Sequence, residues 1–83
     1  MPRFIDHHAT SPNLPPEVIS IIRKALRSGQ PNEFGQKGIN VFIGSQRTFC
    51  CNEAPSADAV RRSHAAMGIS LGPDDVVEVI ALP

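Results

Sequence analysis

The sequence has no excess of charge and no long apolar segment. Its 83 residues include eight Lys and Arg and eight Asp and Glu, so the formal net charge is zero. A balanced charge offers no electrostatic attraction for nucleic acid or an anionic membrane surface, and we expect neither as a partner. No run of about eighteen apolar residues occurs, and residues 1–13 lack the apolar core of a signal peptide. We therefore expect a soluble, cytoplasmic protein.

Cysteine is scarce, and several catalytic motifs are missing. Cys50 and Cys51 are the only cysteines, and because neighbours on a strand point to opposite faces, a disulfide between them would be strained. Reduced thiols are expected. The sequence has no CxxC pair, which excludes thioredoxin-like redox chemistry and zinc ribbons. It also has no glycine-rich phosphate loop and no GxSxG nucleophile elbow.

What the sequence does contain is a succession of strand-like and helix-like segments. Apolar alternation and β-branched residues predict strands over residues 3–8, 38–44, 48–53 and 74–82. Helices are predicted from Pro15 and Pro16 to Gly29, and from Ser56 to Gly68. The second helix carries Val60, His64 and Met67 on one stripe, and Val60 and Met67 are expected in the core. The order βαββαβ is typical of the ferredoxin-like α+β fold, a four-stranded antiparallel sheet with both helices on one face. Residues 1–83 are expected to form one such domain.

The other face of the predicted sheet is also partly apolar. Phe42 lies on the opposite side of its strand from Val41 and Ile43, and residues 76–81 have apolar side chains on both faces. A chain this short has no third layer to cover that face, so the expected cover is a second copy of the chain. The prediction is a homodimer of the α/β-barrel type. The alternative is a monomer whose sheet face contacts water.

Histidine is rare, yet two of the three histidines are adjacent in FIDHH, residues 4–8. Residues two apart on a strand share a face, so Asp6 and His8 project together while His7 points the other way. In the expected topology the first strand ends beside the start of the third, near Cys50. The third strand advances about 10 Å from Cys50 to Glu53, and the second helix, which runs back over the sheet, rises about 12 Å from Ser56 to His64. His64 should therefore lie roughly level with Cys50.

Four side chains are therefore predicted to converge at one end of the sheet as metal ligands: Asp6, His8, Cys50 and His64. One carboxylate, two imidazoles and a thiolate suit Ni²⁺, Zn²⁺, Cu²⁺ or Co²⁺ rather than Mg²⁺ or Ca²⁺. Metal-free interpretations stay open. His64 lies on the apolar stripe of its helix, Cys50 fits a packed core, which is the favoured interpretation of that thiol, and Asp6 can hydrogen-bond to His8.

The order and spacing of these motifs resemble the small nickel-binding ferredoxin-like protein family, formerly classed as a domain of unknown function. That family has Asp-x-His in the first strand, Cys-x-x-Glu-Ala-Pro after the third, and a late His in the second helix followed by Gly. The matching positions are Asp6 and His8, Cys50 with 53–55, and His64 with Gly68. The resemblance covers nearly the whole chain and implies a dimer and nickel binding. His7 and Cys51 depart from the family pattern.

Three functions of different classes follow from these residues. The first is a metal-binding protein that sequesters or carries nickel or a similar divalent ion. The alternative is a small dimeric α/β-barrel enzyme that uses Asp6 and His8 as an acid/base pair. The third is a metal-free interaction module. A tight cluster of ligating atoms would favour metal binding, whereas an open apolar cavity beside Asp6 would favour an enzyme.

Overall fold

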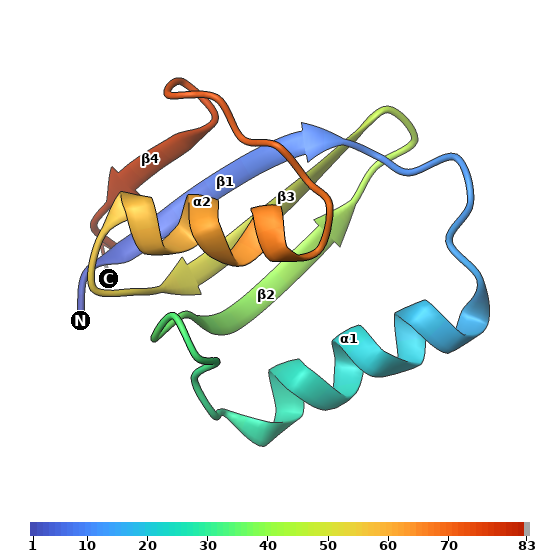
Figure 1. Cartoon of the computed structure of the whole chain (residues 1–83), viewed down its shortest axis with the longest axis horizontal. Coiled ribbons are helices and arrows are strands. Elements are labelled where there is room, and N and C mark those ends of the chain that lie inside the picture. Colours follow the sequence, from blue (N-terminus) through green and yellow to red (C-terminus); the bar gives the residue numbers. More distant parts are fainter. Residues whose placement is uncertain (83) are drawn as a thin grey trace.

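The computed structural model describes residues 1–82 and contains four strands and two helices (Figure 1). Strand β1 spans Arg3–Ala9, helix α1 Pro16–Ser28, β2 Lys37–Ile43, β3 Arg47–Glu53, α2 Ala57–Ala66 and β4 Val76–Val79. The strands form one antiparallel sheet in the order β2-β3-β1-β4. This arrangement is the predicted ferredoxin-like α+β fold.

The residues at the helix ends explain where each helix begins and stops. Helix α1 starts at Pro16, whose fixed φ suits a first helical turn, and stops at Gly29, which has a φ of 64°. Helix α2 is capped by Ser56, whose hydroxyl oxygen accepts the Ala59 N–H at 3.1 Å. Within residues 1–82, neither helix is long and apolar enough to cross a membrane.

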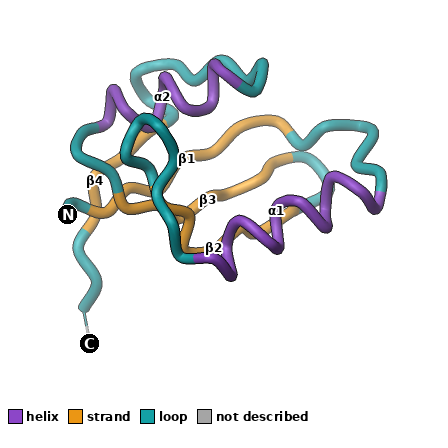
Figure 2. The backbone as a smooth tube through the Cα atoms, turned by 60° about the horizontal axis from the view of Figure 1, so that its bottom comes forward, coloured by secondary structure: helices purple, strands orange, loops and turns teal. Residues whose placement is uncertain are grey.

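Both helices lie on the same face of the sheet (Figures 1 and 2). Helix α1 faces Val41 and Ile43 of β2 across a hollow that it lines with them, whereas α2 places His64 beside Asp6 of β1. In the sheet Val41 pairs with Cys50, and Cys50 pairs with Asp6. Directly paired residues share a face, so all of these side chains point toward the helices.

The apolar core lies under α2. Val60, near the middle of that helix, is completely buried, and the core cluster consists of Phe4, Ala54, Ala59, Val60, Leu71 and Val76. Helix α1 has no fully buried residue and contacts mainly β2, the strand at one edge of the sheet. The two helices therefore differ in attachment, and α2 is the one firmly held over the centre of the sheet.

The opposite face of the sheet carries exposed apolar side chains. Phe42 is 58% exposed, Phe49 44% and Val77 51%. These residues come from β2, β3 and β4, so the apolar surface crosses the sheet. The prediction that this face is partly apolar is confirmed, and the homodimer that would cover it stays a prediction.

Two predictions about the later part of the chain were wrong. The last strand was expected over residues 74–82, but it spans Val76–Val79. Val79 pairs with Arg3, the first residue of β1, so the following residues have no β1 residue to pair with. Met67 was expected in the core and is 64% exposed. Helix α2 ends at Ala66 and its last buried residue is His64, so Met67 lies beyond the covered part of the apolar stripe.

Candidate metal centre

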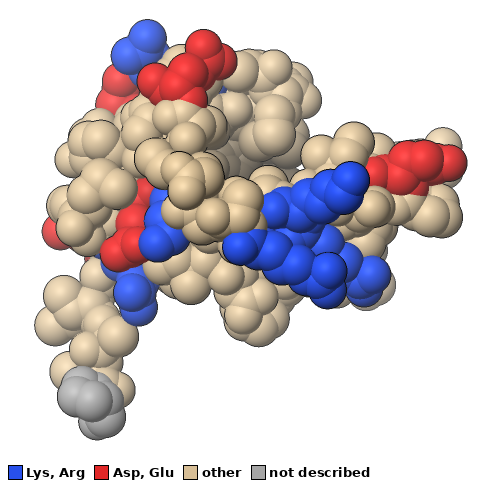
Figure 3. Space-filling view, turned by 90° about the horizontal axis from the view of Figure 1, so that it is seen from below, with Lys and Arg blue, Asp and Glu red and all other residues tan. Residues whose placement is uncertain are grey.

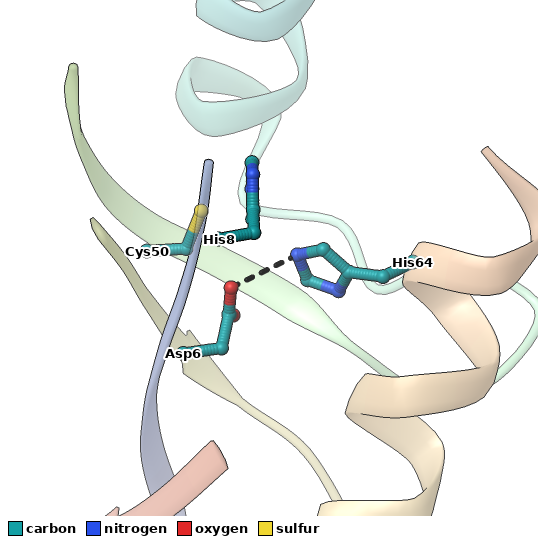
Figure 4. Close-up of side chains that lie close together, drawn as sticks. All are labelled: Asp6, His8, Cys50 and His64. Carbon is teal, nitrogen blue, oxygen red and sulfur yellow. Dashed lines mark ion pairs between the residues drawn. The ribbon is translucent and has the colours of Figure 1, made fainter. Parts of the chain in front are cut away.

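The four predicted ligands come together on the helix-covered face of the sheet (Figure 4). Asp6 and His8 are on β1, Cys50 is on β3 and His64 is on α2. One potential ligand atom from each residue lies within 4.8 Å of all the others. The sheet register accounts for this, because Asp6 pairs with Cys50 while His8 lies one pleat further along the same face. The strand parity assumed from the sequence is thus the parity of the structure.

The spacing of the donor atoms is close to that of a tetrahedral metal site. With metal–ligand bonds of about 2.0–2.3 Å, the donors of a tetrahedral site lie roughly 3.3–3.7 Å apart. The widest separation in the cluster is 4.8 Å at most. Closing the site around an ion therefore needs an inward movement of about 1 Å, which side-chain rotation can supply.

Asp6 is the most constrained member of the cluster. Its side chain is completely buried, and its Oδ2 accepts a hydrogen bond of 2.6 Å from Asn52 Nδ2. Its Oδ1 accepts no hydrogen bond from the described residues. His64 Nε2 lies 3.1 Å from that oxygen, but the alignment is not that of a hydrogen bond. A buried carboxylate oxygen without a donor is costly, and this one faces the other potential ligands.

Backbone carbonyls orient both imidazoles. His64 Nδ1 lies 2.9 Å from the Val60 carbonyl oxygen, and His8 Nδ1 lies 3.0 Å from that of Ala9. A carbonyl oxygen only accepts, so in these contacts Nδ1 carries the proton and the Nε2 lone pair of a neutral imidazole stays free. Hydrogen bonds of this kind commonly fix the tautomer and ring orientation of metal-binding histidines.

The short contact between His64 and Asp6 is stabilised by a cation, either a proton or a metal ion. With its proton on Nδ1, a neutral His64 places an unprotonated Nε2 3.1 Å from the carboxylate oxygen, and two atoms that both carry negative partial charge repel each other at that distance. Either a proton on Nε2 or a metal ion removes that repulsion. Burial would lower the pKa of His64, but the adjacent Asp6 carboxylate outweighs burial and raises the pKa above its ordinary value of 6.5. A proton on Nε2 and a metal ion would therefore compete for the same position beside Asp6.

The Cys50 thiol is the fourth potential ligand of the cluster. Its side chain is 8% exposed, and burial together with the negative charge of Asp6 raises the pKa of the thiol to about 12. At neutral pH Cys50 is therefore protonated unless a cation displaces the proton. Its position serves packing and ligation equally, so both interpretations made from the sequence stay open for this residue.

Asn52 belongs to the cluster, whereas His7 lies outside it. Asn52, which the sequence analysis missed, is buried and holds the Asp6 carboxylate. It stands two positions after Cys50 and so shares its face, and this spacing was the available indication. His7 lies on the opposite face, as predicted, where Arg47 Nη2 is 2.8 Å from its Nδ1. Its ring centroid is 5.9 Å from that of Phe49.

The fold and the cluster define a small ferredoxin-like protein with a candidate transition-metal centre. No family model matches the chain, and neither the curated proteins nor the solved structures include a significant match.

Proposed function

We propose that this protein binds one divalent transition-metal ion per chain and sequesters or carries it. The proposed ligands are Asp6, His8, Cys50 and His64. The observation that carries the proposal is the buried Asp6 oxygen that lacks a hydrogen-bond donor while facing His64 Nε2. A carboxylate and a thiolate together contribute two negative charges, which a divalent ion would neutralise inside a site too buried to hold them unpaired.

Nickel is the metal that we propose first. The donor set of one oxygen, two imidazoles and one sulfur suits Ni²⁺, and the sequence resembles a nickel-binding ferredoxin-like family. Zn²⁺, Co²⁺ and Cu²⁺ accept the same donors, so cellular supply would help to decide which ion is bound. Both cysteines are free, which fits a reducing compartment and supports a cytoplasmic location as part of this proposal.

Acid/base catalysis by Asp6 and His8 is less well supported. Asp6 is completely buried and already bonded through one oxygen to Asn52. A substrate would have to displace the protein around the carboxylate before a proton could move, because acid/base groups act at hydrogen-bond distance. The tight group of donor atoms around Asp6 favours ion binding.

Metal retention tests the proposal directly. We expect protein purified without a histidine tag, loaded with Ni²⁺ or Zn²⁺ and passed through gel filtration, to keep about one equivalent of metal per chain by elemental analysis. The variant His64→Gln, which cannot supply an imidazole, should lose it. A parent protein that keeps almost no metal, or a His64→Gln variant that keeps as much as the parent, contradicts the proposal.

Metal affinity is expected to rise steeply with pH. Binding must displace the proton of Cys50, whose pKa is about 12, so each pH unit in the neutral range should increase the apparent affinity about tenfold. The His64 proton also competes with the metal at pH values below the His64 pKa, which the neighbouring Asp6 raises. Below that pKa, the slope should steepen toward about a hundredfold per unit. Calorimetry between about pH 6 and 8 in buffers of different ionisation enthalpy counts the released protons. A flat dependence across that range would exclude thiolate ligation by Cys50.

We also propose that the protein is a twofold homodimer that buries the open sheet face. Phe42 and Phe49 are adjacent in the β2–β3 pairing and both exposed, and aromatic side chains dominate the energetics of such interfaces. Light scattering should give twice the chain mass at micromolar concentration, and Phe42→Glu should give a folded monomer. A parent protein that remains monomeric at high micromolar concentration would refute the dimer.

A further inference from the structure

An apolar groove lies between helix α1 and strand β2. It is a half-open hollow of about 230 Å³. Its lining consists of Ile19, Ile22, Arg23 and Leu26 from α1 with Val41 and Ile43 from β2. The α1 members are spaced by three and four residues, so they form the helix face turned toward the sheet. Five of the six lining residues are aliphatic, and none is acidic.

Helix α1 approaches β2 closely near its C-terminal end. There Leu26 packs against Gly38, where a Cβ atom would come within 2.9 Å of Leu26 Cδ2. Ile19 and Ile22, in the preceding turns of the helix, are half-buried like Leu26. Aliphatic side chains that face a hollow lose dispersion contacts on that side, so an apolar occupant would be favoured.

The charged side chains around the groove indicate that an occupant should carry a negative charge. Arg23 lines the groove from α1 and is exposed at its edge, and it forms no ion pair with any residue of the described range 1–82. Lys24 and Arg27 are on the same helix, and Lys and Arg side chains gather along α1 (Figure 3). An unpaired guanidinium at the edge of an apolar hollow matches a carboxylate, which it can bind through two parallel hydrogen bonds.

We propose that this groove binds a free aliphatic monocarboxylate, with the carboxylate on Arg23 and the chain along the isoleucines and Val41. At roughly 30 Å³ per non-hydrogen atom, a hollow of about 230 Å³ holds about eight such atoms, which corresponds to the carbon chain of octanoate with its two carboxylate oxygens outside the half-open hollow, on Arg23. Val41 pairs with Cys50, so the occupant lies one strand away from the candidate metal centre. The inference goes beyond the proposed metal binding and does not depend on it.

A titration of ¹⁵N-labelled protein with octanoate, followed by NMR, tests the inference. We expect saturable shifts centred on Val41, Ile43 and Leu26. Arg23→Gln should weaken binding about tenfold or more, because a hydrogen bond to a charged group is lost. Arg27→Gln removes a basic residue of the same helix that does not line the groove and should leave the affinity unchanged.

Two further titrations separate this site from general apolar adsorption and from the metal centre. Octylammonium has a similar chain with the opposite charge and should not compete with octanoate. Addition of EDTA, which would remove a metal ion from the proposed centre, should leave the affinity for octanoate unchanged. The inference is overturned by shifts that never saturate, by equal binding of octylammonium, or by an Arg23→Gln variant that binds as tightly as the parent.

Discussion

The domain is expected to unfold when Val60 is replaced by aspartate. Val60 is completely buried in the cluster that joins α2 to the sheet, together with Phe4 and Val76. Burying a carboxylate without a partner costs several kcal/mol, and leaving a buried charge uncompensated destabilises proteins by about 3–5 kcal/mol. Small domains have a total stability of about 5–15 kcal/mol, and one of this size belongs near the lower end. Thermal denaturation followed by circular dichroism should show no cooperative transition, or one at a much lower temperature.

The matched control places the same substitution on the other helix. Val18 lies in the first turn of α1 and is 38% exposed, so Val18→Asp can keep its carboxylate in water. An acidic residue near a helix N-terminus is also favourable. This variant should melt much as the parent does. A normal cooperative melt for Val60→Asp would mean that α2 presents a different face to the sheet.

The parts of the fold that the sequence predicted well are those set by local rules. The βαββαβ order follows from apolar periodicity, and the helix ends follow from Ser56 and Gly29, whose roles depend on neighbouring backbone atoms alone. The candidate site was predictable for a related reason. Alternation along a strand puts Asp6 and His8 on one face, and the fold brings Cys50 and His64 to the same place.

The features that the sequence did not predict depend on distant parts of the chain. The last strand ends early because β1 begins at Arg3, which lies far away in the sequence, and it starts late because Asp75 is still part of a turn, in which its N–H donates to the Gly72 carbonyl oxygen. Met67 continues the apolar spacing of its helix in the sequence, but the helix ends one residue earlier. Asn52 belongs to the site through one hydrogen bond to Asp6, and only the strand register specifies that contact.

Helix α2 contributes both to the stability of the domain and to the candidate metal centre. The Val60 side chain fills the core, while its carbonyl oxygen holds the His64 ring one turn later. The ring is therefore positioned by the same helical turn that is most firmly packed against the sheet, as a metal-binding or proton-binding group requires. By contrast, His8 comes from the end of β1 and is only partly buried. It is the member of the cluster whose removal disturbs the fold least.

For that reason His8→Ala gives the clearest test of ligation. We expect it to weaken Ni²⁺ or Zn²⁺ binding by more than about a hundredfold, since even residues that only orient a ligand contribute about 10–100-fold to metal affinity. Asp6→Asn keeps an oxygen near the ion but removes its negative charge, and it should weaken binding to a smaller extent. Titration calorimetry of each variant at one pH measures both effects.

His7→Ala is the matched control, because it removes an imidazole from the neighbouring position of the same strand. The His7 side chain lies on the opposite sheet face, where it contacts Arg47 and Phe49. Its loss should therefore leave the metal affinity within about twofold of the parent, since sites without shared partners rarely interact by more than about 0.5 kcal/mol. An equal loss of affinity in His8→Ala, Asp6→Asn and His7→Ala would mean that any substitution in this strand disturbs metal binding, whichever sheet face the side chain lies on. A loss confined to His8→Ala and Asp6→Asn requires direct contact of those two side chains with the ion.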